Sequence, residues 1–262
     1  MYVLGGPPES SDPHAGPWEF LGPIRNMSQR QWAIDGTVFE IDNQLYFAYS
    51  GWPLERAEDD YDEHTQQLFI LRLSDPVTAA SPPTLISSPD EPWERSGDAG
   101  INEGPQWLSS QASDSAPSWR GLVYSCAGSW TPEYKMATLK YLGGDPLVPS
   151  SWAKAAQPLL QNASHGNGPF GPGHGNFVHV GDETFAVFHA TDGRGDGHGN
   201  RKCRMQRVVF GEDGPFMGGE VGGVTRDVAR FSGSSTGTNG GEGHGGKGER
   251  LKGLLHSLAR KV

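Results

Sequence analysis

The sequence predicts an all-β fold, and three observations support that class. The composition is rich in turn formers, with 38 glycines and 20 prolines among 262 residues, together with 8 tryptophans. Such a composition is typical of many short strands joined by tight turns. Short β-branched and aromatic runs recur between the turn residues. These runs fall into three groups that restart along the chain, which indicates repeated units.

The first group begins with a hairpin over residues 37–50, in which two apolar runs flank a turn at Asp42-Asn43. Residues 68–73 predict a third strand, and residues 83–86 a short fourth one. Asn and Asp are residues that tight turns favour, so this spacing predicts consecutive antiparallel strands.

Two further groups follow the same order. The second group contains strand signals at residues 104–108, 121–125, 134–139 and 157–160. The third contains them at residues 175–180, 184–189 and 203–210. An aromatic turn phrase follows the second strand of each group, at residues 49–52, 124–130 and 188–190. This internal symmetry predicts three diverged units of about four strands each.

One polar residue opens each unit: Asp35, then Glu103, 68 residues later, then His174, after another 71. Four-stranded units at a regular period are typical of a β-propeller. The first strand of each blade starts near the propeller axis, so residues at matching positions converge on one site. A chain of this length can form one large all-β domain or two small ones. We expect a single propeller domain over residues 1–231.

Hydrolysis of a glycoside generally needs two carboxyl groups, one of which protonates the leaving oxygen. Glu103 is the better candidate for the acid, because burial among apolar residues would raise its pKa. The charge of Asp35 on a neighbouring unit would raise the pKa of Glu103 further. Glycines on both sides of His174 leave room for a ligand, or for a metal held directly or through water. Taken singly, an Asp at a strand start more often caps a turn, and a lone His more often packs.

Several other classes of function lack support. A net charge of −10 argues against a nucleic-acid partner, since phosphate binding needs clustered Lys and Arg. No apolar run approaches the roughly 18 residues of a membrane span, and no secretion signal is visible at the N-terminus. The chain has no Gly-x-Ser-x-Gly elbow, P-loop or Cys-x-x-Cys motif, so serine hydrolase, nucleotidase and zinc-ribbon functions are not indicated.

Three segments leave alternatives open. Cys126 and Cys203 could form a disulfide or be two small buried residues. Residues 189–199 resemble a metal-binding loop, but the same composition suits a flexible loop between strands. Residues 232–248 are a Gly-rich stretch that predicts a flexible linker, and 249–262 predict a short, basic amphipathic helix. That helix could bind a membrane surface or a partner, or simply remain solvated.

Five short motifs occur in order between about residue 12 and residue 217 of the chain. They are Trp-Ala-Ile-Asp-Gly-Thr at 32–37, Tyr-Ser-Gly-Trp at 49–52, Asn-Glu-Gly-Pro at 102–105, Ser-Trp at 129–130 and Gly-Pro-Gly-His at 171–174. Together they resemble glycoside hydrolase family 43, in particular its α-L-arabinofuranosidases and exo-acting arabinanases. The resemblance implies a five-bladed propeller and inverting hydrolysis of arabinan or arabinoxylan side chains. It also implies an extracellular, monomeric enzyme that requires no cofactor.

The resemblance also assigns roles to individual residues. Glu103 corresponds to the general acid, and Asp35 to the carboxylate that orients the acid and tunes its pKa. His174 corresponds to a histidine near a central metal or water cluster that often holds a structural Ca²⁺. The residues that correspond to substrate-binding positions are Trp32, Trp52, Ser129, Trp130 and Arg204.

One family feature has no counterpart in this chain. The resemblance implies a general base, an aspartate on the first strand of the first blade. Asp12 falls in the turn that ends that blade, and residues 2–4 match its later strands, so the first blade is predicted to be incomplete. A truncated family member with no base is expected to be catalytically impaired. The alternatives are a non-catalytic carbohydrate-binding propeller and a scaffolding propeller without sugar specificity.

Overall fold

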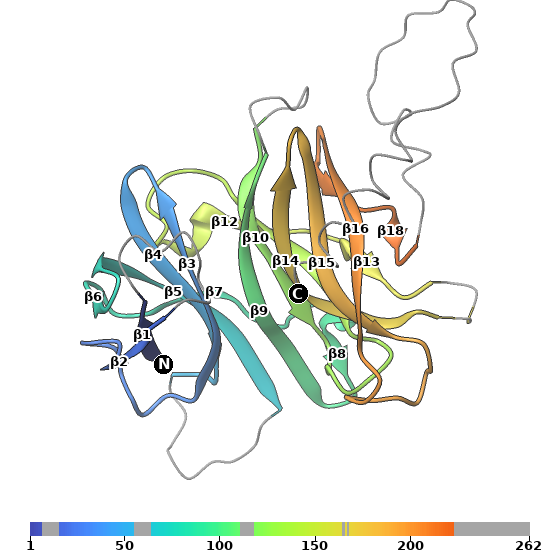
Figure 1. The fold of residues 1–262 in the computed structure, drawn as a ribbon, viewed down its shortest axis with the longest axis horizontal. Coiled ribbons are helices and arrows are strands. Elements are labelled where there is room, and N and C mark those ends of the chain that lie inside the picture. Colours follow the sequence, from blue (N-terminus) through green and yellow to red (C-terminus); the bar gives the residue numbers. More distant parts are fainter. Residues whose placement is uncertain (7–15, 55–63, 111–117, 164–165, 167, 223–262) are drawn as a thin grey trace, which may run out of the picture. The chain divides into compact units, whose positions relative to one another are not determined.

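A computed structural model describes residues 1–6, 16–54, 64–110, 118–163, 166 and 168–222. Over these residues the chain is all-β, as predicted, apart from two single-turn 3₁₀ helices, η1 (Pro92–Glu94) and η2 (Pro149–Ser151) (Figure 1). Asp12, the predicted linker and the predicted C-terminal helix lie outside the described residues. No helix within the described part of the chain is long and apolar enough to cross a membrane.

The first unit has the predicted hairpin followed by a third strand, all antiparallel. Its strands are β3 (Ala33–Ile41), β4 (Gln44–Gly51) and β5 (Thr65–Asp75), with the short β6 (Thr78–Ala79) and β7 (Thr84–Ser87) paired to β5. Both residues of the turn, Asp42 and Asn43, have positive φ, at 51° and 62°. Asp and Asn tolerate this left-handed conformation better than most residues, which explains why the hairpin was readable from sequence.

The second and third units repeat the same meander. The second consists of β8 (Arg95–Ser96), β9 (Ala99–Ser109), β10 (Arg120–Cys126), β11 (Lys135–Tyr141), β12 (Trp152–Lys154) and β13 (Leu160–Gln161). The third consists of β14 (Phe170–Val180), β15 (Glu183–Thr191), β16 (Lys202–Gly211) and β17 (Gly214–Phe216). The short β18 (Gly219–Glu220) pairs in parallel with β13 and so links the end of the third unit to the second.

Two strands near the N-terminus form a separate sheet, β1 (Tyr2–Gly5) with β2 (Glu19–Pro23). One parallel contact joins the first two units, where Thr65 and Gln66 of β5 pair with Gly100 and Ile101 of β9. Over the described residues the strands form a twelve-stranded sheet that runs through the first and second units, a four-stranded sheet in the third unit, and the two-stranded sheet near the N-terminus. A closed ring of five blades remains a prediction.

The hydrophobic core lies between consecutive units rather than inside any one of them. Side chains alternate across each strand, so Ala48 of β4 faces the second unit while Phe47 faces the N-terminal segment. In β10, Leu122 packs against the first unit and Val123 against the third. Figure 1 shows β9 and β10 of the second unit with strands of the other units beside them. Sheets stacked in this way hold the first strands of neighbouring units close to one another.

The two cysteines do not form a disulfide. Cys126 is buried in the core between the first two units, and Cys203 is exposed on β16. The alternative of a disulfide is therefore wrong, and so is the alternative of two buried residues. The two positions belong to different units, and sequence spacing alone does not show which face of its strand each residue takes.

Candidate active site

The first long strand of each unit contains a β-bulge in which one residue has a left-handed backbone. These residues are Asp35 in β3, Gly104 in β9 and His174 in β14, with φ of 58°, 57° and 52°. Strand register breaks at each of the three places. A bulge bends its strand and re-aims a side chain, which makes it a common device beside active sites.

The bulges revise the sequence prediction in one respect. Asp35, Glu103 and His174 lie inside their strands, not at the strand starts, because β3 begins at Ala33, β9 at Ala99 and β14 at Phe170. The strand residues before Glu103 and His174 include glycine, proline or asparagine, which weaken a strand signal in sequence. Counted at the left-handed residues 35, 104 and 174, the period is 69 and then 70 residues.

The three bulges touch one another, so the predicted convergence is confirmed. The backbone N–H of Gly104 donates a hydrogen bond to Oδ2 of Asp35 at 3.1 Å. Nε2 of His174 lies 3.9 Å from Oδ1 of the same carboxylate. A Cβ on Gly104 would lie 3.2 Å from Nδ1 of His174, closer than an ordinary contact, so a larger residue there would press on the imidazole. Asp35 thus bridges the second and third units.

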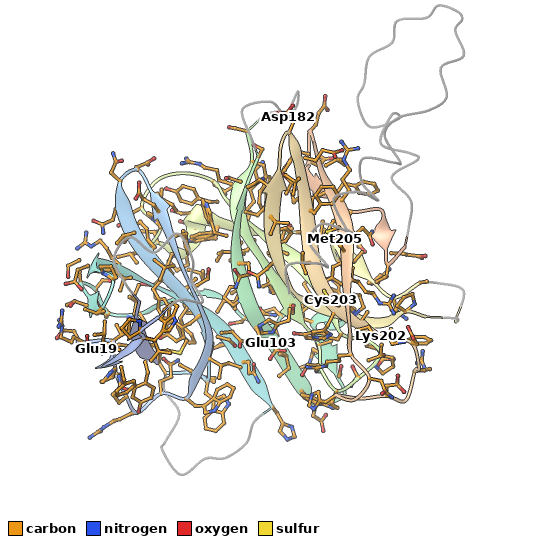
Figure 2. All side chains as sticks on the ribbon, in the orientation of Figure 1. Glu19, Glu103, Asp182, Lys202, Cys203 and Met205 are labelled. Carbon is orange, nitrogen blue, oxygen red and sulfur yellow. The ribbon has the colours of Figure 1, made fainter. Side chains whose placement is uncertain are left out.

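Glu103 is the most buried carboxyl of this group, with only 8% of its surface exposed (Figure 2). Burial raises its pKa above the usual range, and the nearby charge of Asp35 raises it further. A hydrogen bond from the Tyr134 hydroxyl and the charges of His174 and Arg201 oppose this rise without cancelling it. Glu103 therefore holds its proton to a higher pH than an ordinary glutamate, as a general acid must.

Asp35 is also partly buried, and burial raises the pKa of its carboxyl. The charge of His174 and the N–H of Gly104 act in the opposite direction. The same contacts fix the orientation of the carboxylate. Asp35 thus combines a defined position with a charge that acts on Glu103.

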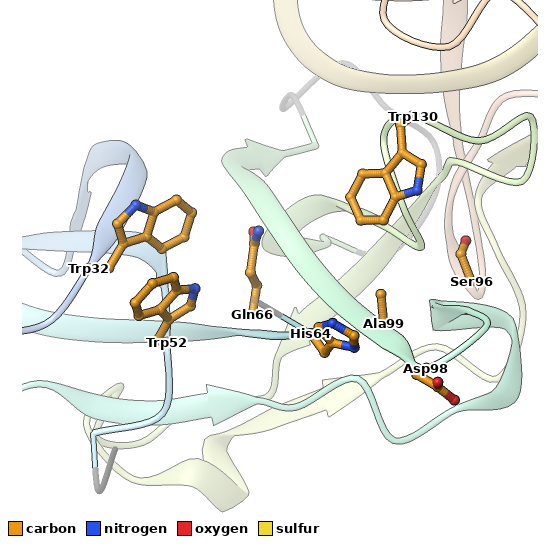
Figure 3. A pocket seen from close by; sticks show the side chains of 8 residues that line it. All are labelled: Trp32, Trp52, His64, Gln66, Ser96, Asp98, Ala99 and Trp130. Atoms are coloured by element: carbon orange, nitrogen blue, oxygen red, sulfur yellow. The ribbon is translucent and has the colours of Figure 1, made fainter. Parts of the chain in front are cut away.

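A cleft of about 370 Å³ opens between the first and second units. Trp32 and Trp52 form a stacked pair on one side, with ring centroids 5.1 Å apart, and Trp130 stands across from them (Figure 3). The remaining lining residues are His64, Gln66, Ser96, Asp98 and Ala99. Flat aromatic walls with a few polar groups between them are typical of small-molecule sites. Three of the five predicted substrate-binding residues therefore share one cleft.

The other two predicted substrate-binding residues lie elsewhere. Ser129 lines a smaller pocket between the second and third units, where its Oγ is 3.2 Å from Nε2 of His198 and its carbonyl accepts from Arg201 at 3.0 Å. Arg204 lines neither pocket and donates to Oδ1 of Asp192 at 2.5 Å. Its buried Nε has no hydrogen-bond partner among the described residues.

Metal ligation is limited in this part of the chain. The described residues contain no group of three or more His, Cys, Asp or Glu side chains placed to hold a metal ion. In the segment 189–199, β15 continues to Thr191, and the Asp196 carboxylate accepts from the N–H of Gly193 at 3.0 Å. Asp196 therefore caps a turn in its own loop.

Sequence reasoning missed Tyr134, His189 and Arg201. The Tyr134 hydroxyl donates to Oε1 of Glu103 at 2.6 Å, although the sequence suggested only the first residue of a strand. The ring of His189 stacks on that of Tyr134, and Arg201 is one of the charges that act on Glu103. These residues meet only because the second and third units pack together, and no local pattern in the sequence predicts that contact.

Comparison with known proteins gives a consistent result. The family model described as "Glycosyl hydrolases family 43" matches residues 8–216. An "Extracellular exo-alpha-(1->5)-L-arabinofuranosidase" from Streptomyces avermitilis is 30% identical over 242 residues, which are 88% of this chain and 46% of that protein. An "Alpha-L-arabinofuranosidase B" from Pyricularia oryzae is 30% identical over 223 residues, 81% of this chain and 42% of that protein. The chain thus spans about half the length of these relatives.

Solved structures show the same fold. The crystal structure of an alpha-L-arabinofuranosidase from Lactobacillus brevis matches with a TM-score of 0.67 and 24% sequence identity. The match covers 82% of this chain and 64% of that one. A thermostable family-43 glycoside hydrolase matches with a TM-score of 0.61 at 22% identity, over 79% of this chain and 64% of that one. At these identities the likeness concerns the fold.

Proposed function

The chain belongs to glycosyl hydrolases family 43, and on that basis we propose that it is a glycosidase of the α-L-arabinofuranosidase type. Its proposed substrates are the arabinose-containing side chains of arabinan or arabinoxylan. The observation that carries the proposal is the buried carboxyl of Glu103, which is held in place by Tyr134 and has a pKa that burial and the charge of Asp35 raise. A carboxyl group that keeps its proton to a raised pH is what protonation of a glycosidic oxygen requires.

In the proposed reaction, Glu103 gives its proton to the glycosidic oxygen as the bond from that oxygen to the anomeric carbon breaks. Water attacks the anomeric carbon from the opposite face, its extra proton passes to bulk water, and the configuration at that carbon is inverted. Asp35 would keep the acid protonated and oriented through its charge and through its bond to Gly104.

No residue of this chain is assigned to remove the proton from the attacking water. We therefore propose that turnover by the chain itself is impaired. A general base typically contributes about 10²–10⁴-fold to the rate, so a slow but measurable hydrolysis is expected.

The cleft with Trp32, Trp52 and Trp130 is the proposed binding site for sugar residues of the polysaccharide. Flat indole faces suit the C–H faces of sugar rings, and the polar residues between them can hydrogen-bond hydroxyl groups. Ser129 and Arg204 are proposed to contact the sugar from the third-unit side. By analogy with the relatives named as extracellular, we propose that the protein acts outside the cell, as a monomer.

We propose that the reaction itself requires no cofactor. A Ca²⁺ ion generally takes six to eight oxygen ligands. At the position predicted for Ca²⁺, the nearby side chains are the carboxylate of Asp35 and the imidazole of His174, which together supply only two oxygen ligands. These two side chains do not fit a directly ligated Ca²⁺, so an ion near His174 would have to be held through water.

The test combines turnover with binding. The purified chain and its Glu103→Gln variant are assayed on an aryl α-L-arabinofuranoside, and binding of arabino-oligosaccharides is measured by calorimetry. We expect slow hydrolysis by the chain, at least ~100-fold less by the variant, and similar binding by both. Glu183→Gln, an exposed carboxylate paired with Arg207 on the third unit, is the matched control.

Other outcomes would favour other functions. Binding without turnover by either protein would favour a non-catalytic carbohydrate-binding propeller, which the three-tryptophan cleft could also serve. Neither turnover nor binding would leave only a scaffolding role. A rate equal to that of an intact family member would contradict the proposed impairment.

A further inference from the structure

Tyr134 makes the shortest hydrogen bond to the proposed general acid. Its side chain is fully buried, and its hydroxyl donates to Oε1 of Glu103 over 2.6 Å. The residue lies immediately before β11, and its backbone N–H donates to the Thr131 carbonyl of the preceding turn. A short bond to a buried carboxyl group is among the stronger hydrogen bonds in proteins.

Two residues of the third unit hold the Tyr134 ring from outside its own unit. Gly173 lies so close that a Cβ would be 2.0 Å from Cε1 of the tyrosine, so a glycine is required there. The imidazole of His189 stacks on the same ring, with centroids 5.7 Å apart and planes 10° from parallel. Packing therefore leaves the phenol little freedom, and the position of its hydroxyl is set by the contact between units.

We propose that Tyr134 is a positioning residue for Glu103: it occupies Oε1 with a hydrogen bond and so leaves Oε2 to carry the proton that is transferred. This inference rests on the proposed function of Glu103 as the acid. The carbonyl oxygen of a protonated carboxyl group is its better acceptor, so a hydrogen bond from the phenol to Oε1 favours the proton on Oε2. Tyr134 keeps its own proton throughout, and the proton on Oε2 passes to the leaving oxygen.

The bond also acts on the carboxylate that remains after transfer. Burial and the neighbouring Glu103 raise the pKa of Tyr134 well above its usual value, so the hydroxyl stays a donor. A hydrogen bond to the ionised form of a carboxyl group stabilises that form. Removing the hydroxyl should therefore raise the pKa of Glu103, whereas a purely structural role for Tyr134 would lower stability and leave that titration unchanged.

The experiment is a pH titration of Glu103 in the Tyr134→Phe variant, monitored through the ¹³C NMR signals of labelled glutamate carboxyl groups. The Glu103→Gln variant identifies which signal belongs to Glu103. We expect the Glu103 midpoint to rise by about one pH unit, with kcat about tenfold lower and KM little changed. Tyr124→Phe is the matched control, because that buried hydroxyl also donates to a glutamate Oε1, of Glu94, at 2.8 Å. It should not move the Glu103 midpoint.

An unchanged Glu103 midpoint in folded Tyr134→Phe would overturn the inference. If that variant does not fold, the wild-type protein with ¹³Cζ-labelled tyrosine replaces it. One tyrosine resonance should then follow the Glu103 midpoint and lose that transition in Glu103→Gln, and the absence of such a resonance would also overturn the inference. Because these readouts need no turnover, a shifted midpoint in an inactive protein would support the contact while contradicting the proposed hydrolysis.

Discussion

The second and third units share one strand plan but differ in what covers them. The second unit packs buried side chains on both faces, against the first unit on one side and the third on the other. On the third unit, Val178 and Met205 remain 40% and 38% exposed. The same contrast holds at the bulges, where the Glu103 residue is 8% exposed and the His174 side chain 42%. Equivalent bulges therefore differ in chemistry according to how deeply their neighbours bury them.

The largest expected difference between the two units is in packing. Leu139→Ala removes a side chain that is 2% exposed in the core between the first and second units. We expect a loss of about 2–5 kcal/mol in the free energy of unfolding, measured by urea denaturation. Met205→Ala on the third unit should cost less than about 0.5 kcal/mol. Comparable losses would mean that the outer face of the third unit is covered in solution.

The next effect concerns His189, a half-buried residue of the third unit whose ring stacks on Tyr134 of the second. Burial, together with the charge of Arg201, lowers the pKa of His189 to about 4, so the ring is neutral in the folded protein. An unfolded histidine binds a proton below about pH 6.5. Stability should therefore fall as the pH drops from 6.5 to 4, by roughly 1–2 kcal/mol after allowance for screening by solvent.

His189→Phe keeps a ring to stack on Tyr134 but has no proton to bind. Its unfolding free energy, measured by urea denaturation across this pH range, should lack that part of the loss. The exposed His179→Phe on β14 is the control, and it should leave the loss in place. A pH dependence that is identical in all three proteins would show that the buried ring does not cause the acid sensitivity.

A smaller effect distinguishes the two neighbours of Glu103. Asp35→Asn removes the negative charge that raises the pKa of Glu103, while its amide oxygen can still accept from Gly104. The Glu103 midpoint, followed by ¹³C NMR, should move to lower pH, by less than the rise expected for Tyr134→Phe. His174→Gln should move it little and upward, because the charge of His174 acts in the opposite sense. A larger shift from His174→Gln than from Asp35→Asn would mean that His174, not Asp35, has the stronger influence on the pKa of Glu103.

The smallest effect is on stability at Glu103 itself. A carboxyl whose pKa is raised on folding contributes stability below its ordinary value of 4.5 and loses it as the pH rises through the folded pKa. Glu103→Gln should therefore raise Tm at pH 7 by at most a few degrees, and this gain should vanish below about pH 4.5. Differential scanning calorimetry at the two pH values measures it. A lower Tm for the variant at pH 7 would contradict this account of burial.

Sequence patterns predicted the strands well where alternation and turn chemistry are local. The hairpin of β3 and β4 and the succession β9, β10 and β11 were readable because apolar runs end at turn residues. The short β2 and β18 were missed, since a few residues of mixed polarity carry no periodic signal. Their pairing depends on chain segments distant in sequence.

The candidate site was only partly readable. The regular spacing of Asp35, Glu103 and His174 predicted their convergence, because equivalent positions of repeated units are brought together by the repeat itself. Tyr134 and His189 have no such periodicity. They meet at one interface between units, and that contact depends on tertiary packing and on the absence of a side chain at Gly173.

The left-handed residue in each bulge limits which amino acids can stand there. Only glycine adopts that backbone freely, and among the other residues asparagine, aspartate and histidine do so most often. Aspartate and histidine can carry a charge, and aspartate, asparagine and histidine can all bind metals or hydrogen-bond a substrate. The repeated strands thus contain three positions with a left-handed backbone, and the residues other than glycine that favour this backbone have side chains suited to chemistry. At positions 35 and 174, an exchange among aspartate, asparagine and histidine would change the reactive group while keeping a residue that tolerates this backbone.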